Sequence, residues 1–104
     1  MAPYRYVPPR HDLPDQHASE IRAAAATRPD VRAVYWLTTL YESDGESIAQ
    51  DVIHIELVDP PEEAASPEQA RDLWATIPLG SRGVGVISTK SILPQIRQVG
   101  LRIA

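Results

Sequence analysis

The sequence predicts a single small α+β domain, with a mixed or antiparallel sheet of three to four strands and helices on one face. Three observations predict this class. A chain of 104 residues has room for one hydrophobic core. Two segments rich in β-branched and aromatic residues lie on either side of a turn signal, as in an antiparallel hairpin. Segments with apolar residues at helical spacing lie before and after that hairpin. The expected order of elements is therefore α-β-β-α-β-α, to which the last residues can add a short strand.

Residues 1–13 are expected to form an extended arm, and residues 14–104 the domain. Four of the ten prolines fall within the first 14 residues, and proline fixes φ and lacks a backbone N–H, which favours an extended chain. Tyr4, Tyr6 and Val7 can anchor this arm to the body of the domain.

The first helix is expected from about Pro14 to Arg28. Asp12 is the expected cap, and Pro14 suits the first turn. Ala18 and Ile21 are three residues apart, so they lie on the inward face of this helix.

The hairpin is expected from strands near Val31–Glu42 and Ile48–Val58, joined by the turn at Ser43–Glu46. Successive side chains of a strand point to opposite faces of a sheet. Two sets therefore alternate along the second strand: Ile53, Ile55 and Leu57 on one face, and Val52, His54, Glu56 and Val58 on the other.

The second half of the chain opens on a capping box at Ser66–Gln69, with proline at the first helical position. This helix is expected to end near Ile77, before Pro78. A third strand is expected near Val84–Ser88, and Ser88 or Thr89 is the expected cap of a last helix. The apolar residues of the two helices that are expected to face inward are Ala70, Leu73, Trp74 and Ile77, and then Ile92, Leu93, Ile96 and Val99.

Composition and charge narrow the function classes. The net charge of −4 argues against a general nucleic-acid binder or a partner on an anionic membrane surface, both of which need a basic face. The absence of cysteine excludes disulfides and thiol chemistry. We expect a cytoplasmic protein, because the N-terminus has no apolar signal segment and no apolar run is long enough to span a bilayer. No cofactor is expected.

The glycine-rich stretch Pro78–Lys90 does not have the pattern of a phosphate-binding loop. Gly80 and Gly85 have the spacing of a Walker loop, but the lysine it requires is missing. The glycines also lie between a helix and a strand, whereas a dinucleotide loop lies between a strand and a helix. We interpret the stretch as a turn. Ser88, Thr89 and Lys90 can bind an anion weakly at a helix start, although a capping role is favoured.

His54 and Glu56 are the one pair of residues whose types and spacing suggest a chemical role, because they are two apart on a strand and share a face. Such a pair can contribute to a metal site or to proton transfer. The spacing is common, so a solvated or interface position is favoured. We assign no catalytic residues and no metal ligands, and an enzyme is the less favoured class.

The first strand of the hairpin is apolar on both faces. If helices cover one face, the other exposes a contiguous apolar patch, and such patches mark contact surfaces. Alternatively, the N-terminal arm folds over this face. The predicted binding surface consists of Val34, Trp36, Leu40, Val52, His54 and Glu56.

The run P-D-V-R-A-V-Y-W, which follows an alanine-rich helix introduced by H-D-L-P, resembles the C-terminal domain of the enhanced serine sensitivity protein family, SseB. The residues that carry the resemblance are Asp30-Val31, Ala33-Val34-Tyr35 and His54-Ile55-Glu56-Leu57. It extends from about Val7 to the C-terminal end. The resemblance implies a compact α/β domain associated with serine tolerance, and it supplies no catalytic residues.

We therefore expect a non-catalytic protein-binding or regulatory module that acts through the sheet face, with a protein partner or a second copy as the occupant. The alternative is a small-ligand or metal-binding protein, or a minor enzyme, with a pocket near Gly80–Lys90 and His54/Glu56. A scaffold subunit of a larger complex is a third class.

Overall fold

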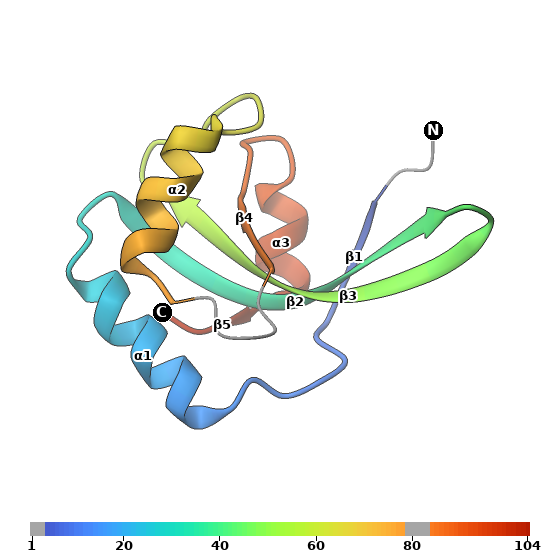
Figure 1. Cartoon of the computed structure of the whole chain (residues 1–104), viewed down its shortest axis with the longest axis horizontal. Coiled ribbons are helices and arrows are strands. Elements are labelled where there is room, and N and C mark those ends of the chain that lie inside the picture. The colour runs from blue at the N-terminus through green and yellow to red at the C-terminus, as the bar shows by residue number, and fades with distance from the viewer. Residues whose placement is uncertain (1–3, 79–83) are drawn as a thin grey trace.

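The computed structural model describes residues 4–78 and 84–104, and within these ranges it confirms the α+β class (Figure 1). The sheet has five strands instead of three to four, because part of the N-terminal arm adds one. None of the helices in the described ranges is both long and apolar enough to cross a membrane. In chain order the elements are β1 (Arg5–Val7), α1 (Asp15–Ala26), β2 (Val31–Ser43), β3 (Glu46–Leu57), α2 (Pro67–Thr76), β4 (Val84–Ile87), α3 (Leu93–Val99) and β5 (Leu101–Arg102).

The sheet is built on the long antiparallel hairpin of β2 and β3. Strand β4 pairs parallel to β3 on one side. On the other side, β1 and β5 both pair antiparallel to β2 at different points along its length. The end of the hairpin extends as a ribbon beyond the helices (Figure 1). Both faces of the sheet are therefore less covered near the hairpin end than near the helices.

A two-residue turn sets the register of the hairpin. Asp44 and Gly45 have φ angles of 52° and 78°, as a type I′ hairpin turn requires. Ser43 consequently lies opposite Glu46, and the same register places Tyr35 opposite His54 and Trp36 opposite Ile53. Directly opposed residues share a face. Trp36 therefore lies on the same face as Ile53, and His54 lies on the other.

Helices cover both faces of the sheet, so the prediction that they lie on one face is wrong. Helices α1 and α2 pack on the face that carries Trp36 and Ile53. Helix α3 packs on the opposite face, where its Ile96 contacts Tyr35 and Leu37. In Figure 1, α1 and α2 lie in front of the sheet and α3 lies behind it. The reason is the sequence of β2, which is apolar on both faces and needs cover on each.

The predicted helix starts have mixed outcomes. Ser66 caps α2 as predicted, since its hydroxyl accepts a hydrogen bond from the Gln69 N–H at 3.2 Å. Helix α1 starts after Pro14 without a side-chain cap, so the prediction of Asp12 as its cap is wrong. The N-cap of α3 is Ile92, again without a side-chain cap, so Ser88 and Thr89 do not cap that helix.

Replacing the cap of α2 by alanine is expected to lower the free energy of unfolding. Ser66→Ala removes the oxygen that accepts from the Gln69 N–H, and such a loss costs about 1 kcal/mol. Urea denaturation measures the change. Ser66→Asp is the matched control, because a carboxylate also caps a helix and should keep the stability close to that of the natural chain. Equal stability of all three proteins would contradict the cap.

Candidate functional site

The predicted binding surface is not one exposed patch, and that prediction is wrong. Val34 and Trp36 are buried beneath α1 and α2, and the indole N–H of Trp36 donates to the backbone oxygen of His11 at 2.7 Å. Val52, His54 and Glu56 point to the opposite face and are also buried. Only Leu40 is partly exposed. The predicted residues lie on two different faces of the sheet because the hairpin register pairs Val34 and Trp36 with the isoleucines of β3.

The open surface of the sheet is instead a groove on the face that carries His54. Helix α3 has seven residues and covers only part of this face, above Ala33, Tyr35 and Leu37. The remaining space is a hollow of about 360 Å³ that crosses the hairpin from β1 to β4. We call it the tyrosine groove. Its lining residues are Tyr4, Tyr6, Thr39, Tyr41, Gln50, Val52, His54, Val84 and Val86.

Strand β1 and the residue before it form one wall of the tyrosine groove. Tyr4 and Tyr6 are two apart in an extended segment, so both rings lie on the same face. The Tyr4 ring packs edge-to-face on Tyr41, with ring centres 5.5 Å apart. The Tyr6 ring packs in the same way on His54, at 5.7 Å. The arm therefore supplies aromatic side chains to the groove, and it does not close it.

His54 lies buried at the floor of the tyrosine groove. Its Nδ1 atom is 3.0 Å from the Ser88 hydroxyl oxygen. Burial lowers the pKa of His54 to about 4, so the ring is uncharged at neutral pH. Among the described residues, the lining contains no Asp, Glu, Lys or Arg. The groove therefore offers aromatic and aliphatic surface with neutral hydrogen-bonding groups.

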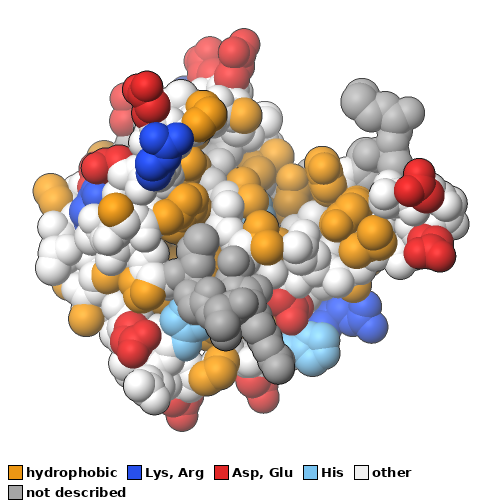
Figure 2. Space-filling model, in the orientation of Figure 1, with side chains coloured by type: hydrophobic (Ala, Val, Ile, Leu, Met, Phe, Trp, Pro, Cys, Tyr) orange, Lys and Arg blue, Asp and Glu red, His pale blue; other side chains and the backbone are white. Residues whose placement is uncertain are grey.

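An acidic hairpin end borders this uncharged groove. Glu42, Asp44 and Glu46 are exposed around the turn, and Figure 2 shows acidic side chains at the end of the hairpin farthest from the helices. A partner that fills the groove and extends along the hairpin would meet negative charge there. The surface is consequently neutral and apolar at its centre and negative at one side.

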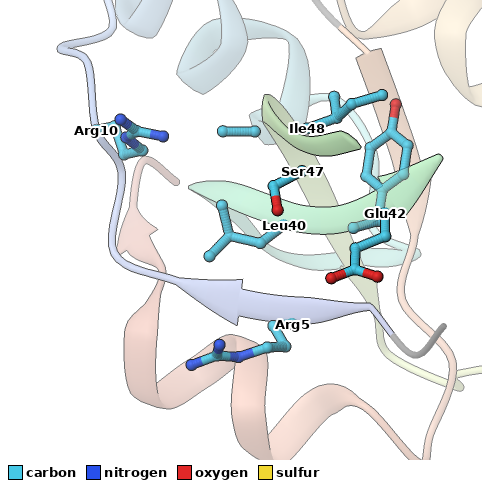
Figure 3. Close-up of a pocket in the computed structure, with 8 residues that line it drawn as sticks. Arg5, Arg10, Leu40, Glu42, Ser47 and Ile48 are labelled. Atoms are coloured by element: carbon cyan, nitrogen blue, oxygen red, sulfur yellow. The ribbon is translucent and has the colours of Figure 1, made fainter. Parts of the chain in front are cut away.

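A second hollow, of about 370 Å³, lies beside the hairpin and has a different character. Figure 3 shows that Arg5 and Arg10 reach it from β1 and the segment after β1, whereas Leu40 and Glu42 come from the hairpin. Its lining therefore mixes both signs of charge with a few aliphatic groups. Leu40, the partly exposed member of the predicted surface, belongs to this hollow and not to the tyrosine groove.

The predicted weak anion site at Ser88, Thr89 and Lys90 does not form at a helix start, because α3 begins at Leu93. Ser88 is fully buried and its hydroxyl contacts His54. The Thr89 hydroxyl contacts that of Ser91 at 3.2 Å. Gly80, in the predicted pocket near Gly80–Lys90, lies outside the described residues.

His54 and Glu56 share a face as predicted, but they have different partners. Glu56 pairs with Arg97, whose guanidinium nitrogens lie 2.9 and 2.8 Å from the two carboxylate oxygens. The guanidinium lowers the pKa of Glu56. Residues 4–78 and 84–104 contain no group of three His, Asp or Glu side chains placed to hold a metal ion.

Sequence reasoning missed most of the tyrosine groove. Val52 and His54 were identified, and the arm with Tyr4 and Tyr6 was given as an alternative cover of this face. Tyr41 and the valines of β4 were not identified. The signal for the hairpin residues was present in the turn: Asp44-Gly45 is typical of a two-residue hairpin loop, and that loop length alone fixes which residues of β2 and β3 face each other. The places of β1 and β4 beside the hairpin depend on tertiary contacts.

No protein-family model, curated protein or solved structure matches this chain.

Proposed function

We propose that this chain is a non-catalytic binding module, and that the tyrosine groove receives an apolar side chain from a protein segment flanked by lysine or arginine. One observation carries the proposal: a hollow lies open on the sheet, and its described lining has three tyrosines, three valines and no charged side chain. The interaction would use the same face of the sheet as His54, with Tyr41 and Val86 replacing Val34 and Trp36 as contact residues.

The chemistry of the lining favours a protein segment as the occupant. Tyrosine offers a large contact area with few rotatable bonds, and its hydroxyl can satisfy a polar neighbour, so it is enriched at interfaces. Val84 and Val86 are each 38% exposed, so an incoming apolar group can bury their side chains. Burial of this surface supplies the favourable free energy of binding.

The charges around the groove select the flanks of the partner. Asp44 and Glu46 lie exposed at the hairpin end, whereas Glu42 lines the second hollow, and the chain carries a net charge of −4. Complementary charge speeds association and disfavours acidic partners. A segment with lysine or arginine beside its apolar anchor therefore fits this surface.

The resemblance to the SseB C-terminal domain stays a prediction, as does a cytoplasmic location. Neither names a partner. A small apolar ligand is the second candidate, because the volume of about 360 Å³ falls within the range of about 300–1,000 Å³ that small-molecule sites occupy.

A random-peptide display library, selected on the immobilised full chain, tests the proposal. Enriched peptides are expected to share an apolar anchor with Lys or Arg nearby. Val86→Asp should weaken their binding at least about tenfold, because a charge would be buried against the anchor. Val58→Asp is the matched control, since Val58 is 59% exposed and lies outside the lining. Circular dichroism checks that both variants fold.

Three outcomes would count against this function. Peptides with acidic flanks would contradict the charge argument. Equal binding by the Val86→Asp and Val58→Asp variants would place the contact elsewhere. A dimer of the chain alone that Val86→Asp dissociates, seen by sedimentation, would make a second copy the occupant.

A further inference from the structure

A cluster of three arginines surrounds one buried carboxylate at the other end of the face that α3 covers. It lines a hollow of about 280 Å³, and we call it the arginine pocket. Its lining contains three guanidinium groups and one carboxylate, so positive charge is in excess there although the whole chain is acidic. The lining residues are Arg32, Ala33, Tyr35, Glu56, Arg97 and Arg102.

One arginine is sufficient to satisfy the carboxylate. Arg97 donates to both oxygens of Glu56 in a bidentate pair, which is the strongest geometry for a guanidinium and a carboxylate. The Tyr35 hydroxyl lies 3.4 Å from the same carboxylate as a further donor, and burial together with the charge of Glu56 raises the pKa of Tyr35, so this hydroxyl stays protonated. The charge of Glu56 is therefore compensated before the other two arginines are considered.

An irregularity in the sheet brings Arg32 into the pocket. The pairing of β2 with β3 shifts between Val31 and Ala33, and such a bulge redirects a side chain. The Arg32 Nε atom lies 3.4 Å from a Glu56 oxygen, while its side chain is 64% exposed. The Arg32 side chain therefore lines the pocket and is also accessible to a solute.

Strand β5 supplies Arg102. Its register places Arg102 opposite Tyr35, so both side chains lie on the face of the pocket. The Nε atom of Arg102 donates to the backbone oxygen of Ala104 at 3.1 Å. Among the described residues, no Asp or Glu side chain forms an ion pair with Arg102. Its terminal nitrogens are left for another acceptor.

We propose that the arginine pocket binds a phosphate group, with Arg32 and Arg102 as the principal ligands and Arg97 and Tyr35 at its base. Arginine matches phosphate oxygens through paired N–H donors, and the three guanidinium groups of the described lining outnumber its one side-chain carboxylate, which favours an anion as the ligand. The volume of about 280 Å³ is just below the usual range for small-molecule sites, roughly 300–1,000 Å³. It suits a phosphate group in preference to a whole nucleotide. This site is independent of the tyrosine groove.

The test is a titration of the full chain with inorganic phosphate at about pH 7.5, where phosphate is largely a dianion, with ionic strength held constant by chloride. The readout is the NMR signals of the arginine Nε–H groups. Saturable shifts at Arg32 and Arg102 are expected. The double variant R32Q/R102Q should bind phosphate about a hundredfold more weakly, at about tenfold for each arginine. R10Q/R71Q removes the same charge from exposed positions outside the pocket and should bind as the natural chain does.

Two further arms define the ligand. Glycerol 3-phosphate and inorganic phosphate separate a phosphate monoester from the free ion, and saturable binding of either supports the site. Acetate should bind at least about tenfold more weakly, because it carries one charge. Equal binding of acetate and phosphate, equal binding by the two double variants, or no saturable response to either phosphate compound would overturn the proposal. R102Q alone serves as a second variant if R32Q/R102Q does not fold.

Discussion

Replacing Trp36 by alanine is expected to lower the free energy of unfolding by about 4 kcal/mol, the middle of the range for buried tryptophan. Trp36 is 5% exposed and packs between the sheet and the helices α1 and α2. Its indole also holds the N-terminal arm through the His11 backbone oxygen. A domain of this size has a total stability of roughly 5–15 kcal/mol, so a charged residue at this position should unfold the chain.

Urea denaturation of Trp36→Ala measures this loss directly. Trp74→Ala is the matched control, because Trp74 lies only partly buried at the edge of the same core and should lose about half as much or less. If Trp36→Ala were as stable as the natural chain, Trp36 would be a surface residue, and the placement of α1 and α2 on its face would be wrong.

Lowering the pH from about 7.5 to about 5 is expected to remove about 2 kcal/mol of stability through His54 alone. Burial lowers the pKa of His54 from 6.5 in the unfolded chain to about 4 in the folded one. Between these values the unfolded state binds the extra proton, so unfolding becomes more favourable as the pH falls. The loss begins near pH 6.5 and ends near pH 4, below which both states are protonated.

His54→Gln removes this titration. Between about pH 7.5 and about pH 5, this variant should therefore lose about 2 kcal/mol less stability than the natural chain loses. His11 and His17 remain in both proteins, so their effects cancel in the comparison. Glu56 does not interfere above about pH 5, because its pKa in the folded chain is below its ordinary value of 4.5. Parallel stability curves for the two proteins would contradict a buried neutral His54.

Local patterns predicted the elements that depend on neighbouring residues. Ser66-Pro67 signals a helix start by itself, and the structure places the cap there. The turn around Asp44-Gly45 and the strands on each side of it also agree. The extended arm was expected, but not its pairing with β2 as β1. Nothing local in a three-residue strand specifies its partner, since pairing is decided by tertiary contacts.

The main error in the prediction concerned which faces of the sheet the helices cover, and it had two causes. The inward side chains of the last helix were correctly identified, for example Ile96, but periodicity does not show which face of the sheet a helix covers. The predicted surface then joined Trp36 to His54, although the turn places Trp36 opposite Ile53. Applying the register from the turn would have separated these two residues.

The arginine pocket could not be predicted from spacing. Arg97 is 41 residues from Glu56, and they meet only because α3 crosses to the face of β3 that carries Glu56. Arg32 contributes through an irregularity in the pairing of β2 with β3, and the residue type at that position does not predict such an irregularity. The partners of a buried charge are decided by tertiary packing, whereas the strand position of Glu56 was readable from alternation.

The most direct test of the central claim is an NMR map of the full chain with one selected peptide bound. Because the described lining of the tyrosine groove is open and carries no charged side chain, the largest shifts are expected at Tyr41, Val52 and Val86, all of which line it. Little change is expected at Val58 or on the outer surfaces of α1 and α2. Shifts concentrated on those helices, with Tyr41 and Val86 unchanged, would contradict recognition through this groove.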